Sequence, residues 1–212
     1  MITSDQGVYL FGGADRPWNE SDWVASDDRV RGGKSQSYME CSSDSTVASF
    51  HGHLDITALG GAGFASQRSK DPHTWDLSNC QGLCVKVNDS DGKKYTLILK
   101  DEVLPRRADG REQSSVSWEF DFVTQETRLF IPWKDLKPTY RGRPLPDAKP
   151  LDLRKISRVS IMMRSFFGQQ EGCFRLELQY IAAIKSKNES KLSPPLTIAE
   201  SSTSHSSLKY EK

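Results

Sequence analysis

Residues 116–122 read VSWEFDF and residues 174–180 read FRLELQY, so large apolar side chains alternate with polar ones in both stretches. A period of two places every apolar side chain of such a run on one face of a β-strand. The same alternation recurs at residues 83–87, 95–99 and 159–164, and shorter strand candidates lie at 35–41, 46–54, 64–67 and 128–131. Strands with one apolar face bury it by packing two sheets together, which predicts a sandwich.

Turn-forming dipeptides separate these runs: Asp91-Gly92, Asp109-Gly110, Arg141-Gly142 and Glu171-Gly172. No stretch has the period of a long amphipathic helix. Short helical turns are expected at residues 17–23, 133–136 and 151–156, the last with Asp152 as its cap. The predicted fold class is therefore all-β, a two-sheet antiparallel β-sandwich of about nine or ten short strands.

The C-terminal segment, residues 185–212, differs in composition from the rest of the chain. It is rich in Ser and Lys, contains Pro194-Pro195 and has few large apolar side chains. Such a segment buries too little apolar surface to offset the entropy of ordering it. The sequence predicts one folded domain over residues 1–184 and a disordered tail over 185–212, which acts as a tether or phosphorylation target or is dispensable.

The charge balance excludes several classes of partner. The 212 residues carry 29 Lys and Arg against 28 Asp and Glu, a formal net charge of +1. A nucleic-acid-binding domain shows a strong basic surplus or a clustered basic face, and a membrane anchor shows a polybasic cluster. Neither is evident in the overall balance, so no nucleic-acid partner is expected, while a local basic patch stays open. No apolar run is long enough to span a bilayer, so no transmembrane segment is expected either.

Cysteine usage and the N-terminal residues point to a reducing compartment. Four scattered cysteines are too few for a disulfide framework, so reduced thiols are expected. The first residues, MITSDQG, are neither a secretory signal nor an arginine-rich mitochondrial presequence. A cytoplasmic location is therefore kept as one alternative.

Candidate metal ligands are sparse. His51, His53 and Asp55 alternate and would share one face of a strand, which is compatible with a metal or with a solvated strand face. No fourth ligand is indicated for a structural zinc site. Cys80 and Cys84 lack a second pair at zinc-ribbon spacing, and Cys84 is expected to be a small buried apolar side chain. We expect no metal and no cofactor.

No catalytic grouping stands out. The stretch Gly60-Gly61-Ala62-Gly63 lacks the third glycine of a dinucleotide fingerprint and is interpreted as a tight turn with positive φ. There is no Gly-x-Ser-x-Gly nucleophile elbow and no Ser-His-Asp or Cys-His arrangement. A cleft of scattered carboxylates with His51 or His53 stays open as an enzyme alternative, but we expect a protein that is not an enzyme.

Three loop-like stretches are dense in the residue types that dominate protein interfaces: residues 27–35, 131–144 and 164–172. The alternative is an internal role, in which arginines pair with carboxylates and aromatic side chains plug the ends of the sandwich. The candidate partner-binding residues are Arg29, Arg31, Trp133, Tyr140, Arg141, Arg143, Arg164, Phe166 and Phe167.

The same stretches belong to an ordered set of short motifs. The motifs are DRVRGGKS at 28–35, FHGHL at 50–54, GGAGFAS at 60–66, DLS at 76–78, GL at 82–83, DGKKY at 91–95, IPW at 131–133 running through to Arg143-Pro144, and IMMRSFFG at 161–168. This set resembles the complex I intermediate-associated protein family, the thirty-kilodalton assembly factors of mitochondrial NADH:ubiquinone oxidoreductase. Each motif is short, but their order covers about residues 8–184, nearly the whole predicted domain.

The resemblance implies a galactose-binding-like jelly-roll β-sandwich. It also implies a non-catalytic, chaperone-like protein that binds complex I assembly intermediates or other assembly factors, peripheral to a membrane complex in the mitochondrion. Binding residues of the family are not defined by a motif, so the resemblance assigns no site. The alternatives are a carbohydrate-binding β-sandwich module and a protein-binding scaffold unrelated to complex I.

Overall fold

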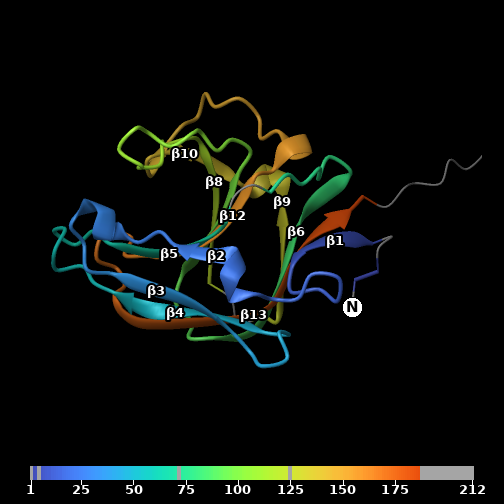
Figure 1. Ribbon diagram of the computed structural model, residues 1–212, viewed down its shortest axis with the longest axis horizontal. Helices are drawn as coiled ribbons and strands as arrows, with labels where there is room; N and C mark the ends of the chain where they lie inside the picture. Colours follow the sequence, from blue (N-terminus) through green and yellow to red (C-terminus); the bar gives the residue numbers. More distant parts are fainter. Residues whose placement is uncertain (1, 4–5, 71–72, 124–125, 187–212) are drawn as a thin grey trace, which may run out of the picture.

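The computed structural model describes residues 2–3, 6–70, 73–123 and 126–186. Within them the chain forms thirteen β-strands and four 3₁₀ turns, and the strands make two antiparallel sheets that face each other (Figure 1). The first sheet contains β1 (Gly7–Phe11), β3 (Gln36–Cys41), β4 (Ala48–Leu54), β6 (Cys80–Ser90), β9 (Arg128–Pro132) and β13 (Gly172–Lys185). The second contains β2 (Trp23–Ala25), β5 (Phe64–Ser69), β7 (Tyr95–Lys100), β8 (Ser117–Phe122), β10 (Lys137–Tyr140), β11 (Arg143–Pro144) and β12 (Arg158–Arg164).

Strand order brings distant parts of the chain together. The first sheet runs β3-β4-β13-β6-β9, and β1 pairs with β13; the second runs β11-β10-β8-β7-β12-β5-β2. The long strand β13 is central because its first half pairs with β4 while β6 lies along its other side. In the second sheet, β7 and β12 are neighbours although about 60 residues separate them in the chain. This is the predicted two-sheet, all-β jelly-roll sandwich.

The core forms from the alternation that the sequence shows. In register across β7 and β8, Tyr95 lies opposite Phe122, Leu97 opposite Phe120 and Leu99 opposite Trp118. These side chains point inward and pack with the buried apolar side chains of β4, β6 and β13. The residues between them point outward, and they form the surface on which the candidate site lies.

The short helical turns are η1 (Glu20–Asp22), η2 (Asp28–Arg31), η3 (Trp133–Asp135) and η4 (Leu153–Lys155). Three of them confirm the expected turns, and the Asp152 side chain accepts a hydrogen bond from the Arg154 backbone N–H as a cap does. The turn η2 was not predicted. No helix in the described ranges has the length and apolarity needed to cross a membrane.

The expected count of strands was too low, because β1, β2, β10 and β11 were missed. The strands β2 and β11 have three and two residues, and β10 contains a proline at position 138. Segments of two or three residues carry no readable alternation, and a proline weakens the strand signal. The last strand extends to Lys185, one residue past the expected end of the domain, and the expected tail from residue 187 onward lies outside the described residues.

Candidate functional site

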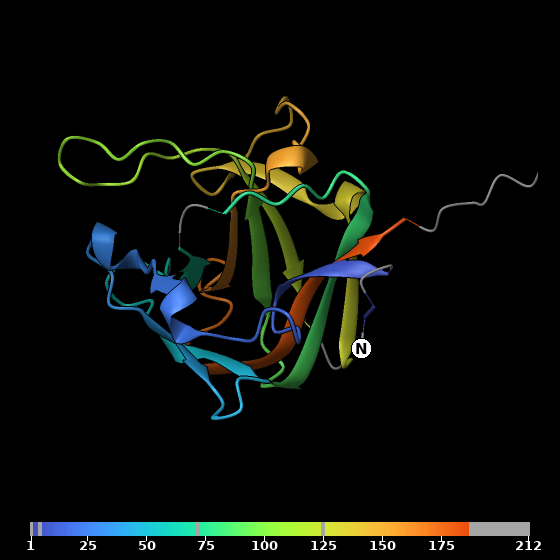
Figure 2. The ribbon, with the colours of Figure 1, turned by 45° about the vertical axis from the view of Figure 1, so that its right-hand side comes forward.

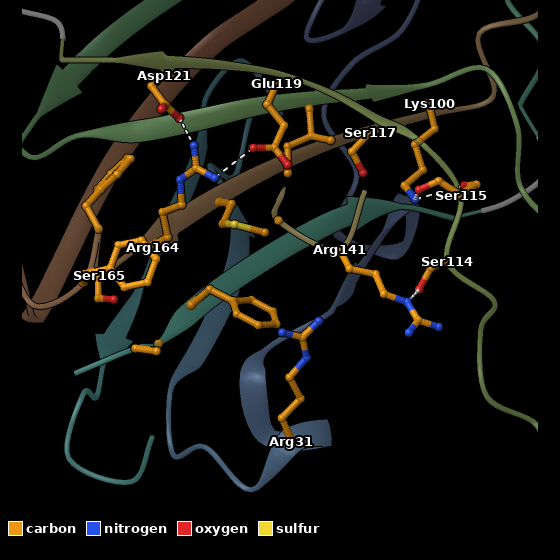
Figure 3. A pocket seen from close by; sticks show the side chains of 18 residues that line it. Arg31, Lys100, Ser114, Ser115, Ser117, Glu119, Asp121, Arg141, Arg164 and Ser165 are labelled. Atoms are coloured by element: carbon orange, nitrogen blue, oxygen red, sulfur yellow. Dashed lines mark hydrogen bonds and ion pairs between the residues drawn. The ribbon is translucent and has the colours of Figure 1, made fainter. Parts of the chain in front are cut away.

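The outer face of the second sheet forms the floor of a pocket of about 470 Å³, here called the rim pocket. The floor consists of outward-facing side chains of three neighbouring strands: Ile98 and Lys100 of β7, Glu119 and Asp121 of β8, and Met162 and Arg164 of β12. The loops that surround this floor include η2, the β10–β11 hairpin and the loop from β12 to β13 (Figure 3). Ala62 and Gly63 before β5, and Ser114 and Ser115 before β8, complete the lining.

An ion-pair network fixes the floor. One guanidinium nitrogen of Arg164 lies 2.8 Å from Glu119 Oε2, and the other pairs with Asp121 Oδ1 (Figure 3). The two carboxylates accept further hydrogen bonds of 2.6 Å, Glu119 from the Thr139 hydroxyl and Asp121 from the Thr96 hydroxyl. Because both carboxylates are engaged, the floor is a pre-organised polar surface rather than a pair of free acids.

Two consecutive aspartates hold η2 in place. The buried Asp28 carboxylate accepts hydrogen bonds from the Ser35 backbone N–H at 3.0 Å, the Ser35 hydroxyl at 2.7 Å and the Phe64 backbone N–H at 3.1 Å. A Cβ on Gly33 would lie 2.2 Å from the Asp28 Cγ, so only glycine fits there. The turn is therefore tied to both β3 and β5.

The neighbouring Asp27 makes a parallel set of contacts. Its carboxylate accepts from the Ser37 hydroxyl at 2.6 Å, the Ser37 backbone N–H at 3.1 Å and the Ser66 backbone N–H at 2.8 Å. Burial outweighs these bonds and raises the pKa of Asp27 above 3.8. The result is a rigid turn whose outward residues are Arg29, Val30 and Arg31, with Val30 84% exposed.

The β10–β11 hairpin closes through a two-residue loop. Tyr140 pairs with Arg143, and between them Arg141 and Gly142 have φ of 54° and 74°. Positive φ at both positions is the geometry of a type I′ turn, which favours Asn-Gly and is strained for arginine. The Arg141 Nε donates to the Ser114 hydroxyl at 3.2 Å, so this guanidinium is held across the mouth of the pocket.

The loop after β12 presents two phenylalanines. Phe166 and Phe167 have φ of 46° and 60°, and Phe167 is 96% exposed. The Phe166 ring lies between two cations, with Lys94 Nζ 4.6 Å and Arg164 Cζ 4.7 Å from its centroid. The Gln170 amide donates to the carbonyls of Lys94 and Arg164, which holds the loop in this shape.

Backbone strain converges on this pocket. Of the four non-glycine residues with positive φ in the described ranges, Arg141, Phe166 and Phe167 line the rim pocket, and only Ser45 lies elsewhere. A left-handed conformation costs a bulky residue about 1 kcal/mol or more, and it persists where surrounding contacts enforce it. Such strain clusters at functional sites, which marks this pocket as the candidate binding site.

A second, more open depression of about 1520 Å³ adjoins the rim pocket and is here called the arginine cavity. The two share Arg31, Ser114 and Arg141. The connection from β7 to β8, which extends away from the sandwich in Figure 2, supplies one wall, and η2 and the hairpin supply the others. The arginines that line it are Arg29, Arg31, Arg68, Arg106, Arg107, Arg111, Arg141 and Arg143.

Eight of the nine candidate residues predicted from the sequence line these two cavities. The exception is Trp133, whose indole packs against the core and donates to the Cys80 carbonyl at 2.7 Å. The sequence analysis missed Lys100, Glu119 and Asp121 on the floor, and Arg107 and Glu112 in the connecting loop. The sequence does carry a signal for Lys100, Glu119 and Asp121, because they alternate with core residues of β7 and β8 and so face outward.

The other sequence candidates have structural roles. His51 Nε2 lies 3.2 Å from Glu40 Oε2, and Asp55 accepts from the Thr57 hydroxyl at 2.9 Å, which is the largest factor holding the Asp55 pKa below 3.8. In the described ranges no three His, Cys, Asp or Glu side chains gather as metal ligands. Gly60 and Gly61 have φ of 63° and 89°, which confirms the tight turn.

The cysteines are free thiols, and Cys84 is buried as expected. It lies outside the main core, however, in a small cluster on the outer face of the first sheet. There Arg128 Nε approaches its sulfur to 3.0 Å, and the Tyr180 hydroxyl lies 4.0 Å away. A cysteine that alternates with core residues faces the opposite side of the sheet, which accounts for its position.

The chain is therefore a jelly-roll β-sandwich with a loop-bordered pocket on the outer face of its second sheet. Solved structures share this fold. The family 11 carbohydrate-binding module of a Clostridium thermocellum cellulosomal cellulase aligns with a TM-score of 0.57 and 13% identity over 87% of this chain and 97% of the module. The same module in complex with a β-1,3-1,4-mixed-linked tetrasaccharide aligns with a TM-score of 0.54 and 13% identity, over 87% of this chain and 98% of that one.

Sequence comparison gives the family. The model of the Complex I intermediate-associated protein 30 family matches residues 10–178, and the chain belongs to that family. An uncharacterized protein of Schizosaccharomyces pombe is 44% identical over 186 residues, which is 84% of each chain. The family resemblance read from the ordered motifs is thereby confirmed.

Proposed function

We propose that this protein is a non-catalytic assembly factor that binds intermediates of mitochondrial respiratory complex I through the rim pocket and the arginine cavity. The observation that carries the proposal is the convergence of three residues with strained backbone on one pocket, in a family named for its association with complex I intermediates. Its place of action would be the mitochondrion, at the periphery of the membrane-embedded complex.

The geometry suits capture of a protein. Phe167 exposes almost its whole side chain, Arg31 and Arg141 of two other loops line the same pocket, and Tyr140 lines the adjoining arginine cavity. Arg and aromatic side chains dominate the energetics of protein interfaces. Because anchored loops hold these side chains before a partner arrives, little conformational entropy is lost on binding.

Gentle-detergent purification of the full-length protein from its own cells tests the proposal. We expect complex I subunits at a stage before completion to co-purify. The double substitution R141N/F167N should abolish their recovery, while S45N, which changes the remaining strained position outside the pocket, should preserve it. Recovery of the wild-type protein without any respiratory subunit or assembly factor would overturn the proposal. Recovery with unrelated proteins would favour a scaffold of another pathway.

Carbohydrate binding is the second candidate, because the solved structures with this fold are carbohydrate-binding modules. Sugar binding relies on an aromatic face open for stacking. Phe167, which is 96% exposed, offers such a face. Against this candidate, cations lie 4.6 and 4.7 Å from the centroid of the Phe166 ring, and Arg164 and hydroxyl donors already engage the floor carboxylates. Calorimetry with mixed-linked β-glucan oligosaccharides and a wider glycan panel decides: heat at millimolar ligand supports this candidate, and no heat ends it.

A further inference from the structure

We infer that the groove formed by the two cavities binds an acidic peptide segment of a partner protein that carries one large apolar side chain. The inference rests on the proposed function, because it specifies the chemistry of the partner at the same site. Carboxylates of the segment would face the arginine cavity, and the apolar side chain would enter the rim pocket.

The arginine cavity is strongly basic in an almost neutral chain. Eight arginines line it, against two acidic residues, Asp27 and Glu112. The chain as a whole has a net charge of only +1. Asp27 is buried, and donors of Ser37 and Ser66 take up its oxygens. Arg111 lies 3.9 Å from Asp109, which is outside the lining. This concentration of one sign on one surface attracts the opposite charge.

Glu112 is the one partly exposed carboxylate that lines the arginine cavity, and a single carboxylate cannot balance eight arginines. Glu112 is shared by Arg68 at 2.7 Å, Arg158 at 2.9 Å and Arg106 at 3.6 Å. In the parts of the chain that the structure describes, no carboxylate lies within ion-pair distance of the exposed guanidinium groups of Arg29, Arg107 and Arg143. These three come from η2, the β7–β8 connection and the hairpin, so they border the cavity on separate sides and can engage carboxylates directly.

The rim pocket supplies the apolar half of the groove. Phe64, Ile98, Met162 and Phe166 contribute its apolar lining, and its volume of about 470 Å³ accommodates a large side chain. Arg31 and Arg141 border both cavities, so a segment that fills the pocket places its neighbouring residues among the arginines.

The floor of the rim pocket favours a peptide over a nucleic acid. Arg164 pairs with both Glu119 and Asp121, so the rim pocket, with its apolar lining, suits an apolar side chain better than a phosphate backbone that follows the groove. The chain's own C-terminal segment is also a poor occupant. Residues 187–212 contain four lysines and three glutamates, and so have no acidic surplus. The charge complementarity therefore points to a second protein.

Selection from a random peptide display library on the purified full-length chain tests this. We expect enriched peptides with clustered Asp and Glu beside one Phe, Leu, Met or Trp. For a selected peptide labelled with fluorescein, R107E/R143E should raise Kd on the order of tenfold or more, and added salt should weaken binding. Both arginines are exposed, so the melting curve of this variant should match that of the wild type.

The matched control is K134E, which changes an exposed lysine on η3 that lines neither cavity and should leave Kd unchanged. Enrichment of neutral or basic peptides, or no enrichment, would overturn the inference. So would a single-stranded RNA oligonucleotide that displaces the labelled peptide and binds more tightly. If complex I subunits co-purify while the selected peptides are not acidic, the inference fails and the proposed function stands.

Discussion

Replacing Phe167 by asparagine should make the protein more stable while it abolishes partner binding. Phe167 has φ of 60° and is 96% exposed, so its ring contributes almost no burial in the isolated chain. Asparagine tolerates the left-handed region far better than a bulky aromatic residue. Relief of that strain is worth about 1 kcal/mol. For a chain of this size such a gain raises Tm by about 2–4 °C.

Thermal melts and urea denaturation of the purified full-length chain measure the effect. The control is S45N, at the one strained non-glycine position of the described residues that is outside the pocket, where φ is 57°. It should raise Tm by a similar amount and leave recovery of partners unchanged. A loss of about 1 kcal/mol or more for F167N would refute the reasoning, because it would mean that the ring stabilises the fold instead of awaiting a partner.

Three further predictions concern the supports of the site and the fold. D28N should lower the free energy of unfolding by about 2–3 kcal/mol, because asparagine sets an amide donor against the Ser35 and Phe64 donors; a urea midpoint equal to that of the wild type would contradict the role of Asp28. E112Q should lower the free energy of unfolding by about 1–2 kcal/mol, because the mostly buried Arg68 and Arg158 lose their shared counter-charge. An unchanged urea midpoint would show that these two ion pairs contribute nothing to stability. Hydrogen bonds from the hydroxyls of Ser42, Thr57 and Ser78 lower the pKa of Asp44, Asp55 and Asp76 below 3.8. The stability that these carboxylates contribute is therefore present above pH 3.8 and is lost as the pH falls through their lower folded-state pKa values. T57A should flatten the fall in Tm on acidification, and an unchanged slope of Tm against pH would contradict the assignment.

The sandwich could be predicted from the sequence because its central strands have one apolar face each. The alternation in residues 116–122 and 174–180 corresponds to β8 and the first half of β13, and Phe122, Leu176 and Leu178 lie in the core. A register shift after Leu178 places Tyr180 in the small outer cluster with Cys84 instead. Short edge strands such as β2 and β11 give no comparable signal, because two or three residues cannot display a period. Their position depends on the neighbouring strand to which they bind.

The site could be predicted in part. Residue types identified the three loops, but their meeting around one pocket depends on strand order, which brings β12 beside β7 and places the β10–β11 hairpin next to β8. Trp133 shows the limit of prediction from residue type, because a tryptophan in a loop is common at interfaces but can also pack against the core, as Trp133 does. The strain at Phe166 and Phe167 has no sequence signature, because a phenylalanine pair normally indicates extended chain rather than a left-handed turn.

Site-specific photo-crosslinking in the native cells tests the central claim most directly. The photoreactive residue p-benzoylphenylalanine would replace Phe167 in one strain and Tyr38, an exposed aromatic residue on the first sheet, in another. The account predicts that position 167 crosslinks to a protein that migrates with complex I assembly intermediates on native gels and that position 38 does not. Crosslinks to such intermediates from position 38 alone would contradict it.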